Sequence, residues 1–249
     1  MFSFFKRRRR RKLLARPEPR TWGPWLADLP FFANLNTNEQ ERLARITRVL
    51  VAEKNWQGAD GLEVTEKIKV QIAAQAALLI LNIEHDHYRR TKSIVIYPST
   101  FQVPDSSDGG RVPTLGQAHE WGTVVLSWNA ARGGVVNPED GQNVVLHEFA
   151  HRLDMLDHHT DGTPPLGSRS QYDTWVRIMT REFQALGDAK QRGRRTLLDK
   201  YGATEPAEFF AVATECFFEK PRQMAKRHAE LYELLRDYYR QDPAERLAS

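Results

Sequence analysis

The chain has almost no cysteine and no long apolar run. Its single cysteine, Cys216, excludes a disulfide within the chain, and we expect a cytoplasmic location. The most apolar stretch, residues 68–83, is interrupted by four polar side chains, which favours a buried amphipathic helix over a membrane span. Internal repeats, a glycine-rich phosphate loop and paired cysteines are also missing, so the chemistry must come from other residues.

Net positive charge is confined to one end of the chain. Residues 1–20 hold nine Lys and Arg against one Glu, a net of +8, whereas the whole chain carries +4, so residues 21–249 carry −4. The consecutive basic residues Lys6–Lys12 repel one another, and we expect a tail that is disordered, or helical only on contact. With the phenylalanines that precede this run, the tail could make weak contact with an anionic membrane or nucleic acid. A solubilising tail without a partner is the alternative.

The most informative feature is the pentapeptide His147-Glu148-Phe149-Ala150-His151. In a helix, this spacing puts both imidazoles on one face about a turn apart, where they can take adjacent corners of a zinc tetrahedron. Glu148 then stands beside the metal ion without ligating it and can accept a proton from water. Apolar residues recur around the motif at helical intervals, and residues 137–141 offer several starts for the helix. The alternative is a solvated helix face with two ordinary histidines.

Asp154 is expected on the same helix face as the two histidines. It follows His151 by three residues and His147 by seven. Its carboxylate could therefore accept a hydrogen bond from a ligand imidazole and orient that ring.

A catalytic zinc site needs a third protein ligand, and residues 201–215 are its best source. Thr204 suits an N-cap and Pro206 a first turn, so we expect a helix to begin here. Glu208 and Glu215 lie seven residues apart on this mostly apolar segment, where buried carboxylates need partners such as a metal ion. From these residues alone, the choice of ligand stays open, and both glutamates could also lie on a solvated face.

The chain resembles the Mlc titration factor A family of bacterial zinc metallopeptidases. The segments that carry the resemblance are 61–79, 147–154, 201–208 and 232–244, and it extends over about residues 25–245. The catalytic half is also similar to the protease domain of anthrax lethal factor, in which a histidine helix is followed by a helix with a Tyr seven residues before the ligand Glu.

The resemblance implies further roles and a function. Tyr201 and Glu208 keep the seven-residue interval, which selects Glu208 over Glu205 and Glu215 as the third zinc ligand. The Tyr201 hydroxyl would donate to the developing oxyanion of the scissile carbonyl, although an ordinary loop aromatic is the alternative. Aminopeptidase-like hydrolysis of short peptides and binding of the glucose repressor Mlc are also implied. A second class of function follows: a regulator that sequesters a repressor and has a structural zinc site.

The remaining pattern predicts an α+β fold, and the resemblance implies a zincin-like architecture with a small sheet at the edge of the cleft. Helices are expected over residues 38–54 and 61–83, and strands over 93–97 and 123–128. The predicted organisation is a basic tail of residues 1–20 and a single metallopeptidase domain of residues 21–249, helical to about residue 90 and catalytic from about residue 91.

Some segments near the site carry weaker signals. Val124–Trp128 could line the substrate groove and bond to an extended peptide, and Pro104–Gly116 could form a loop over it. His119 is a candidate for a further metal contact. The turn 157–162 also holds potential ligands, but polar residues just past a helix end are usually solvated, which argues against a second metal site.

Overall fold

The computed structural model describes the chain except residues 1, 84–85, 87, 105–110, 119–121 and 248–249. The helices are α1 (Phe2–Leu14), α2 (Trp22–Ala27), α3 (Thr37–Glu53), α4 (Glu66–Leu79), α5 (Trp128–Val136), α6 (Val144–Asp154), α7 (Arg169–Gln191), α8 (Pro206–Glu219), α9 (Pro221–Arg227), α10 (Ala229–Tyr239) and α11 (Pro243–Arg246). Three short 3-10 helices are η1 (Phe32–Asn34), η2 (Met155–Asp157) and η3 (Lys200–Ala203). The strands are β1 (Asn55–Gly58), β2 (Ser93–Tyr97), β3 (Phe101–Pro104), β4 (Arg111–Thr114), β5 (Gly116–Ala118) and β6 (Thr123–Ser127). The predicted α+β class is confirmed.

A four-stranded mixed sheet supports the functional region, with strand order β1-β2-β6-β5. Strands β1, β2 and β6 are parallel, whereas β5 runs antiparallel to β6, with Gly116 opposite Leu126. Strand β6 ends at Ser127 because the Ser127 hydroxyl accepts a hydrogen bond from the Ala130 backbone N–H at 3.3 Å and so caps α5. The predicted strands at 93–97 and 123–128 correspond to β2 and β6.

The expectation that Val124–Trp128 line a peptide groove is wrong. This segment is β6 and the first residue of α5, and the β6 backbone already pairs with β2 on one side and β5 on the other. Strand β5 lies at the edge of the sheet instead. A single sequence cannot give this order, because the pairing of strands is decided by segments far apart in the chain.

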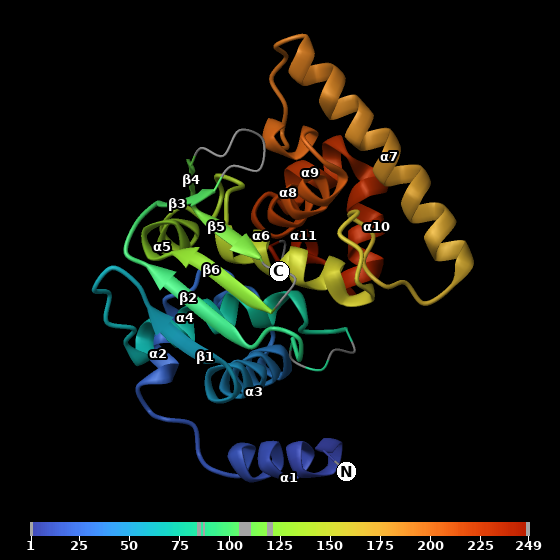
Figure 1. Ribbon diagram of the computed structural model, residues 1–249. Helices are drawn as coiled ribbons and strands as arrows, with labels where there is room; N and C mark the ends of the chain where they lie inside the picture. Colours follow the sequence, from blue (N-terminus) through green and yellow to red (C-terminus); the bar gives the residue numbers. More distant parts are fainter. Residues whose placement is uncertain (1, 84–85, 87, 105–110, 119–121, 248–249) are drawn as a thin grey trace.

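Helix α6 is the central helix of the molecule. It packs against β5 and β6 of the sheet, against α4, and against α8. Figure 1 shows α3, α4 and the sheet on one side of it, and α8, α9, α10 and the long helix α7 on the other. Residues on α6 can therefore meet residues from both halves of the chain.

Two predicted helices are present, and both ends of the second are shifted. Helix α3 agrees with the expected 38–54, and Asn36 and Glu39 form a capping box at its start. Helix α4 is shorter than the expected 61–83, because the Thr65 hydroxyl accepts a hydrogen bond from the Ile68 backbone N–H at 3.3 Å and caps the helix there.

The basic N-terminal segment is a helix in contact with the body, where the sequence favoured a disordered tail. Arg10 donates to Glu53 of α3 at 2.7 Å and also pairs with Asp86, while Arg48 donates to the Leu13 carbonyl oxygen at 2.6 Å. These acidic partners on the body offset the repulsion within the basic run. The division into a tail and a single domain stays a prediction.

Residues 101–104 and 111–114 form an antiparallel pair, β3 and β4, within the segment expected as a loop over the site. The middle of that loop lies outside the described residues. Among the helices that the structure describes, none has the length and apolarity to cross a membrane.

Candidate metal centre

The histidine helix begins at a residue whose side chain fixes its first turn. Asn143 is the N-cap of α6, and its Oδ1 accepts hydrogen bonds from the backbone N–H groups of Val145 and Leu146, both at 3.1 Å. The Asn143 amide donates in turn to Gln75 of α4 at 2.9 Å. The N-cap thus lies two residues after the last of the expected starts at 137–141, and α4 holds the first turn of the helix in place.

Helix α8 supplies the carboxylates opposite α6. It begins with Pro206 in its first turn, as expected, but its N-cap is Glu205 and not Thr204. The Thr204 hydroxyl instead donates to the Tyr201 carbonyl oxygen at 2.7 Å, within the turn that precedes the helix. Packing of α8 against α6 then brings Glu208 and Glu215 to the imidazoles.

Three side-chain atoms from the two helices converge on one point. His147 Nε2 lies 2.9 Å from Glu208 Oε2 and 3.2 Å from His151 Nε2, and His151 Nε2 lies 3.5 Å from the same Glu208 oxygen. In a tetrahedral zinc site with ligand distances near 2.0 Å, neighbouring ligand atoms are about 3.3 Å apart. Within the described part of the chain, His147, His151 and Glu208 are the one group of three His, Cys, Asp or Glu residues placed to hold a metal ion. The donor set and its spacing fit such an ion.

The charges of the three residues depend on one another. Burial alone would raise the pKa of Glu208, but the two imidazoles beside it lower that pKa well below its usual range. Burial alone would lower the pKa of His147, but the carboxylates of Glu215 and Glu208 raise it well above its ordinary value. The site therefore favours an ionised Glu208 and positive charge beside it.

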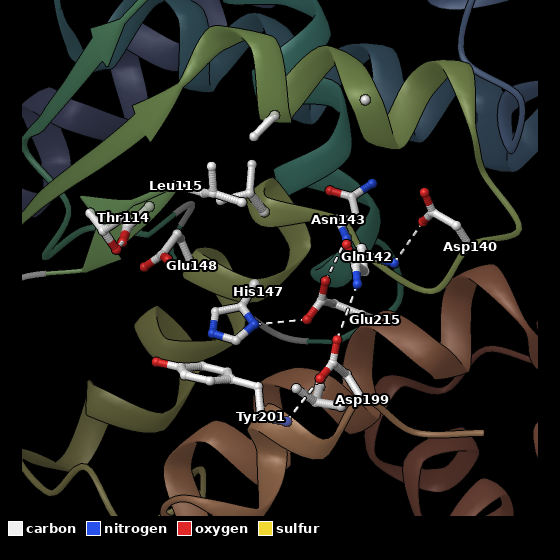
Figure 2. A pocket seen from close by; sticks show the side chains of 15 residues that line it. Thr114, Leu115, Asp140, Gln142, Asn143, His147, Glu148, Asp199, Tyr201 and Glu215 are labelled. Carbon is white, nitrogen blue, oxygen red and sulfur yellow. Dashed lines mark hydrogen bonds and ion pairs between the residues drawn. The ribbon is translucent and has the colours of Figure 1, made fainter. Parts of the chain in front are cut away.

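Glu215 has a contact that the sequence did not assign to it. Its Oε1 lies 2.7 Å from Nδ1 of His147, on the opposite side of the ring from Glu208, as Figure 2 shows for the His147–Glu215 pair. The sequence feature that could have predicted this contact is the seven-residue spacing of Glu215 from Glu208, which puts both carboxylates on one face of α8.

Asp154 does not make the hydrogen bond that was expected of it. It is fully buried, and its Oδ2 accepts a hydrogen bond from the Gly162 backbone N–H at 2.9 Å, so it holds the segment that follows η2. Burial raises the pKa of Asp154 to about 6. The side chain that bonds to a ligand imidazole is Glu215, because the packing of α8 against α6 brings it to Nδ1 of His147, whereas the Asp154 carboxylate bonds to the Gly162 backbone.

Glu148 is buried between α6 and the edge of the sheet. Its side chain is turned away from the Glu215 side of His147 toward Thr114 and Leu115 (Figure 2). Burial raises the pKa of the Glu148 carboxyl to about 7, although the two imidazoles oppose this. A side chain on Gly116 of β5 would overlap the Glu148 side chain, so the close approach of this strand needs a glycine.

Tyr201 lies in η3 beside the metal-binding group. Its ring centroid is 6.2 Å from that of His147, and the residue is 54% exposed. Partial burial and the nearby Glu208 raise its pKa to about 12, so the hydroxyl keeps its proton at neutral pH and can donate it to a hydrogen bond.

A cavity of about 500 Å³ opens beside His147 and Glu148. Its walls come from the edge of the sheet, from α5 and α6, and from the start of η3, and include Leu115, Gly133, Asn143 and Tyr201. His119 lies outside the described residues. In the turn 157–162, His158 contacts Arg90 at 2.9 Å and Asp157 accepts from the His159 backbone N–H, so no second cluster forms among the residues that are described there.

An α+β fold with two imidazoles and a carboxylate around one point, next to a buried carboxyl and a cavity, defines a class of candidate metal-dependent proteins. The chain belongs to the family of glucose-regulated metallo-peptidases M90, whose family model matches residues 4–240. The resemblance to Mlc titration factor A is thereby confirmed.

Relatives align over nearly the whole chain. It is 36% identical to an uncharacterized protein of Synechocystis sp. over 94% of this chain and 89% of the relative. It is 32% identical to Mlc titration factor A of Yersinia enterocolitica over 88% and 85% of the two chains, and 30% identical to Mlc titration factor A of Serratia proteamaculans over 93% and 92%.

Proposed function

We propose that this protein is a zinc-dependent peptidase with aminopeptidase-like activity on short peptides. The observation that carries the proposal is the convergence of His147, His151 and Glu208 on one point, with Glu148 and a cavity beside it. Membership of a metallo-peptidase family supports it. The proposed location is the cytoplasm, and the proposed architecture is zincin-like, with β5 as the strand at the edge of the cleft.

The proposed mechanism assigns one task to each residue. His147, His151 and Glu208 would hold a zinc ion, which supplies Lewis acidity that lowers the pKa of water and polarises a peptide carbonyl. Glu148 accepts the proton of the attacking water and returns it to the leaving amine. The Tyr201 hydroxyl donates a hydrogen bond to the oxyanion that develops on the carbonyl. Strand β5, paired only with β6 in the described sheet, offers backbone groups to an extended peptide.

A second candidate function rests on the relatives named Mlc titration factor A. In this alternative, the protein binds and sequesters a Mlc-like transcriptional repressor, and the zinc site is structural. The two functions differ in their dependence on Glu148, because a proton acceptor is needed for hydrolysis and not for binding a repressor.

Replacement of Glu148 by Gln tests the proposed function. Because Glu148 is assigned to move protons and not to hold the metal, hydrolysis of short peptides should fall by roughly two to four orders of magnitude. Zinc content, measured by emission spectrometry, should stay at the wild-type level. A zinc-loaded Gln variant with undiminished turnover would exclude this mechanism and favour the repressor-binding alternative.

The assignment of the third ligand is tested by a pair of substitutions on the same helix. Glu208→Ala should lose most of the zinc, as should His147→Ala and His151→Ala, because each removes a donor atom from the converging set. Glu205→Ala is the matched control, since Glu205 is the exposed N-cap of α8 and should leave zinc content unchanged. If zinc content stays at the wild-type level in Glu208→Ala but falls in Glu205→Ala, the wrong carboxylate was assigned.

A further inference from the structure

Glu215 is a buried carboxylate that the proposed mechanism does not use. Its residue is 6% exposed, and both of its oxygens have partners on α6. Oε1 lies 2.7 Å from Nδ1 of His147, and Oε2 accepts a hydrogen bond from the backbone N–H of Asn143, the N-cap of that helix. One side chain of α8 thus contacts both the start of the histidine helix and the first imidazole on it (Figure 2).

The direction of the His147–Glu215 contact decides which nitrogen of His147 can bind a metal ion. An ionised carboxylate only accepts hydrogen bonds, so His147 donates from Nδ1. A neutral imidazole that carries its proton on Nδ1 has its lone pair on Nε2, the atom that lies 2.9 Å from Glu208 and 3.2 Å from His151. The contact therefore directs the lone pair toward the point where the three donor atoms converge.

The two imidazoles differ in this respect. Nδ1 of His151 is buried and has no hydrogen-bond partner among the described residues. Among the described residues, no acceptor at Nδ1 therefore helps to orient the His151 ring, whereas the His147 ring has a carboxylate from another helix at that atom.

We propose that Glu215 is the positioning residue of the metal centre. It fixes the tautomer and ring orientation of His147, and it ties that ring to the first turn of α6, so that zinc binds more tightly than it would to the two imidazoles and Glu208 alone. This inference rests on the proposed zinc site and adds to it a residue that does not contact the metal. Acceptors behind a metal-bound imidazole typically contribute about 10- to 100-fold in metal affinity.

The test is a zinc competition titration of the purified full-length chain against a chromophoric chelator. Glu215→Gln keeps the size of the side chain, but its amide nitrogen cannot accept, so it cannot serve both His147 and Asn143. The expected result is zinc affinity weakened about 10- to 100-fold. Glu205→Gln is the control, because it removes the same charge from an exposed position at the start of α8 and should change the affinity by less than about twofold.

Thermal unfolding of the zinc-free variants separates positioning from a structural role. If Glu215 only stabilises the start of α6, the Gln variant unfolds at a lower temperature while the folded protein binds zinc as tightly as wild type, which would overturn the inference and leave the proposed zinc centre intact. A wild-type chain that binds no zinc would instead overturn the proposed function, and this inference with it. If the Gln variant does not fold, Glu215→Asp keeps the charge on a shorter side chain. Wild-type affinity in that variant would overturn the inference, and a drop of about tenfold would support it.

Discussion

At the scale of single residues, the site depends on a glycine that leaves room for a functional side chain as well as on the functional side chains themselves. Glu148 can occupy its buried position because Gly116 of β5 has no Cβ. A Cβ at this position would overlap the Glu148 carboxylate and the Val144 side chain. Gly133 of α5, which also lines the cavity, has open space where a Cβ would point. Two glycines that line one cavity therefore have different tolerance for substitution.

Gly116→Ala should lower peptide hydrolysis by roughly tenfold or more while zinc content stays near that of wild type. The added methyl displaces the Glu148 side chain, and a shift of about 1 Å in a catalytic group can cost a hundredfold in rate. The matched control is Gly133→Ala, which adds the same methyl to the same cavity without a clash and should keep wild-type turnover. Measurements of kcat and of zinc per chain on both variants decide the matter, and equal turnover in both would show that Gly116 does not hold Glu148 in place.

At the scale of elements, the N-terminal helix α1 has two faces with different partners. Lys6, Arg10, Leu13 and Leu14 recur at helical spacing and are partly buried, and Arg10 pairs with Glu53 and Asp86. The exposed face carries Arg7, Arg8 and Arg11. Docking of the helix thus leaves a basic face directed to solvent, and contact of Lys6–Lys12 with an anionic membrane or nucleic acid stays a prediction.

Neutralising that face with Arg7→Gln, Arg8→Gln and Arg11→Gln should lower binding to anionic lipid vesicles at low salt by roughly tenfold or more, because each basic residue near such a surface contributes about 1 kcal/mol. The part of the vesicle binding that the triple variant loses at low salt should also be lost by wild type at high salt, since exposed charges are screened over about 10 Å at 0.1 M. Zinc content should not change. Co-sedimentation is the measurement, repeated with a short DNA duplex to compare the two kinds of partner.

A triple Gln variant at Arg192, Arg194 and Arg195, which are exposed just beyond α7, is the control for net charge. It should bind vesicles as wild type does. Equal binding by the two triple variants would show that the α1 run is only a solubilising segment.

At the scale of the whole molecule, the segment from Tyr88 to Lys92 joins helices that are distant in sequence. Lys54, at the end of α3, donates through Nζ to the carbonyl oxygens of Tyr88 at 2.7 Å and Thr91 at 2.9 Å. Arg152 of α6 donates to the Thr91 hydroxyl at 3.1 Å. A buried ammonium group therefore helps to connect the N-terminal helices to the helix that carries the site.

The buried position of Lys54 predicts a rise in stability at alkaline pH. Burial lowers its pKa from 10.5 to about 8, so the unfolded chain binds this proton more tightly than the folded chain does. The free-energy cost of the buried charge is full below about pH 8 and is relieved as the pH rises toward the unfolded value. For this group alone, the free energy of unfolding should increase by about 1.5 kcal/mol between about pH 8 and about pH 9.5.

Urea unfolding of wild type and Lys54→Met at those two pH values measures the effect. The Met variant should be less stable at the lower pH, because two carbonyl groups lose a donor, and its stability should rise less with pH. Lys92→Met, at an exposed position, should keep the wild-type rise. A Lys54→Met chain with the same pH dependence as wild type would contradict the shifted pKa.

The sequence by itself determined the parts of this protein that depend on local spacing. The interval between His147 and His151 places both rings on one helix face. Spacing alone left Glu208 and Glu215 open as the third ligand, and the family resemblance implied Glu208, the carboxylate that the structure brings to the two rings. Hydrophobic periodicity likewise located α3, β2 and β6, because the 3.6- and 2-residue periods are written directly in the chain.

Only the tertiary structure decided which side chains face one another across elements. In the folded protein, Glu215 and not Asp154 forms the hydrogen bond with His147. Strand β5 and not β6 lies at the edge of the sheet, and the basic segment contacts Glu53. Each outcome depends on how α6, α8 and the strands pack after they form. Such packing brings together residues tens of positions apart, and no local spacing in a single sequence records it.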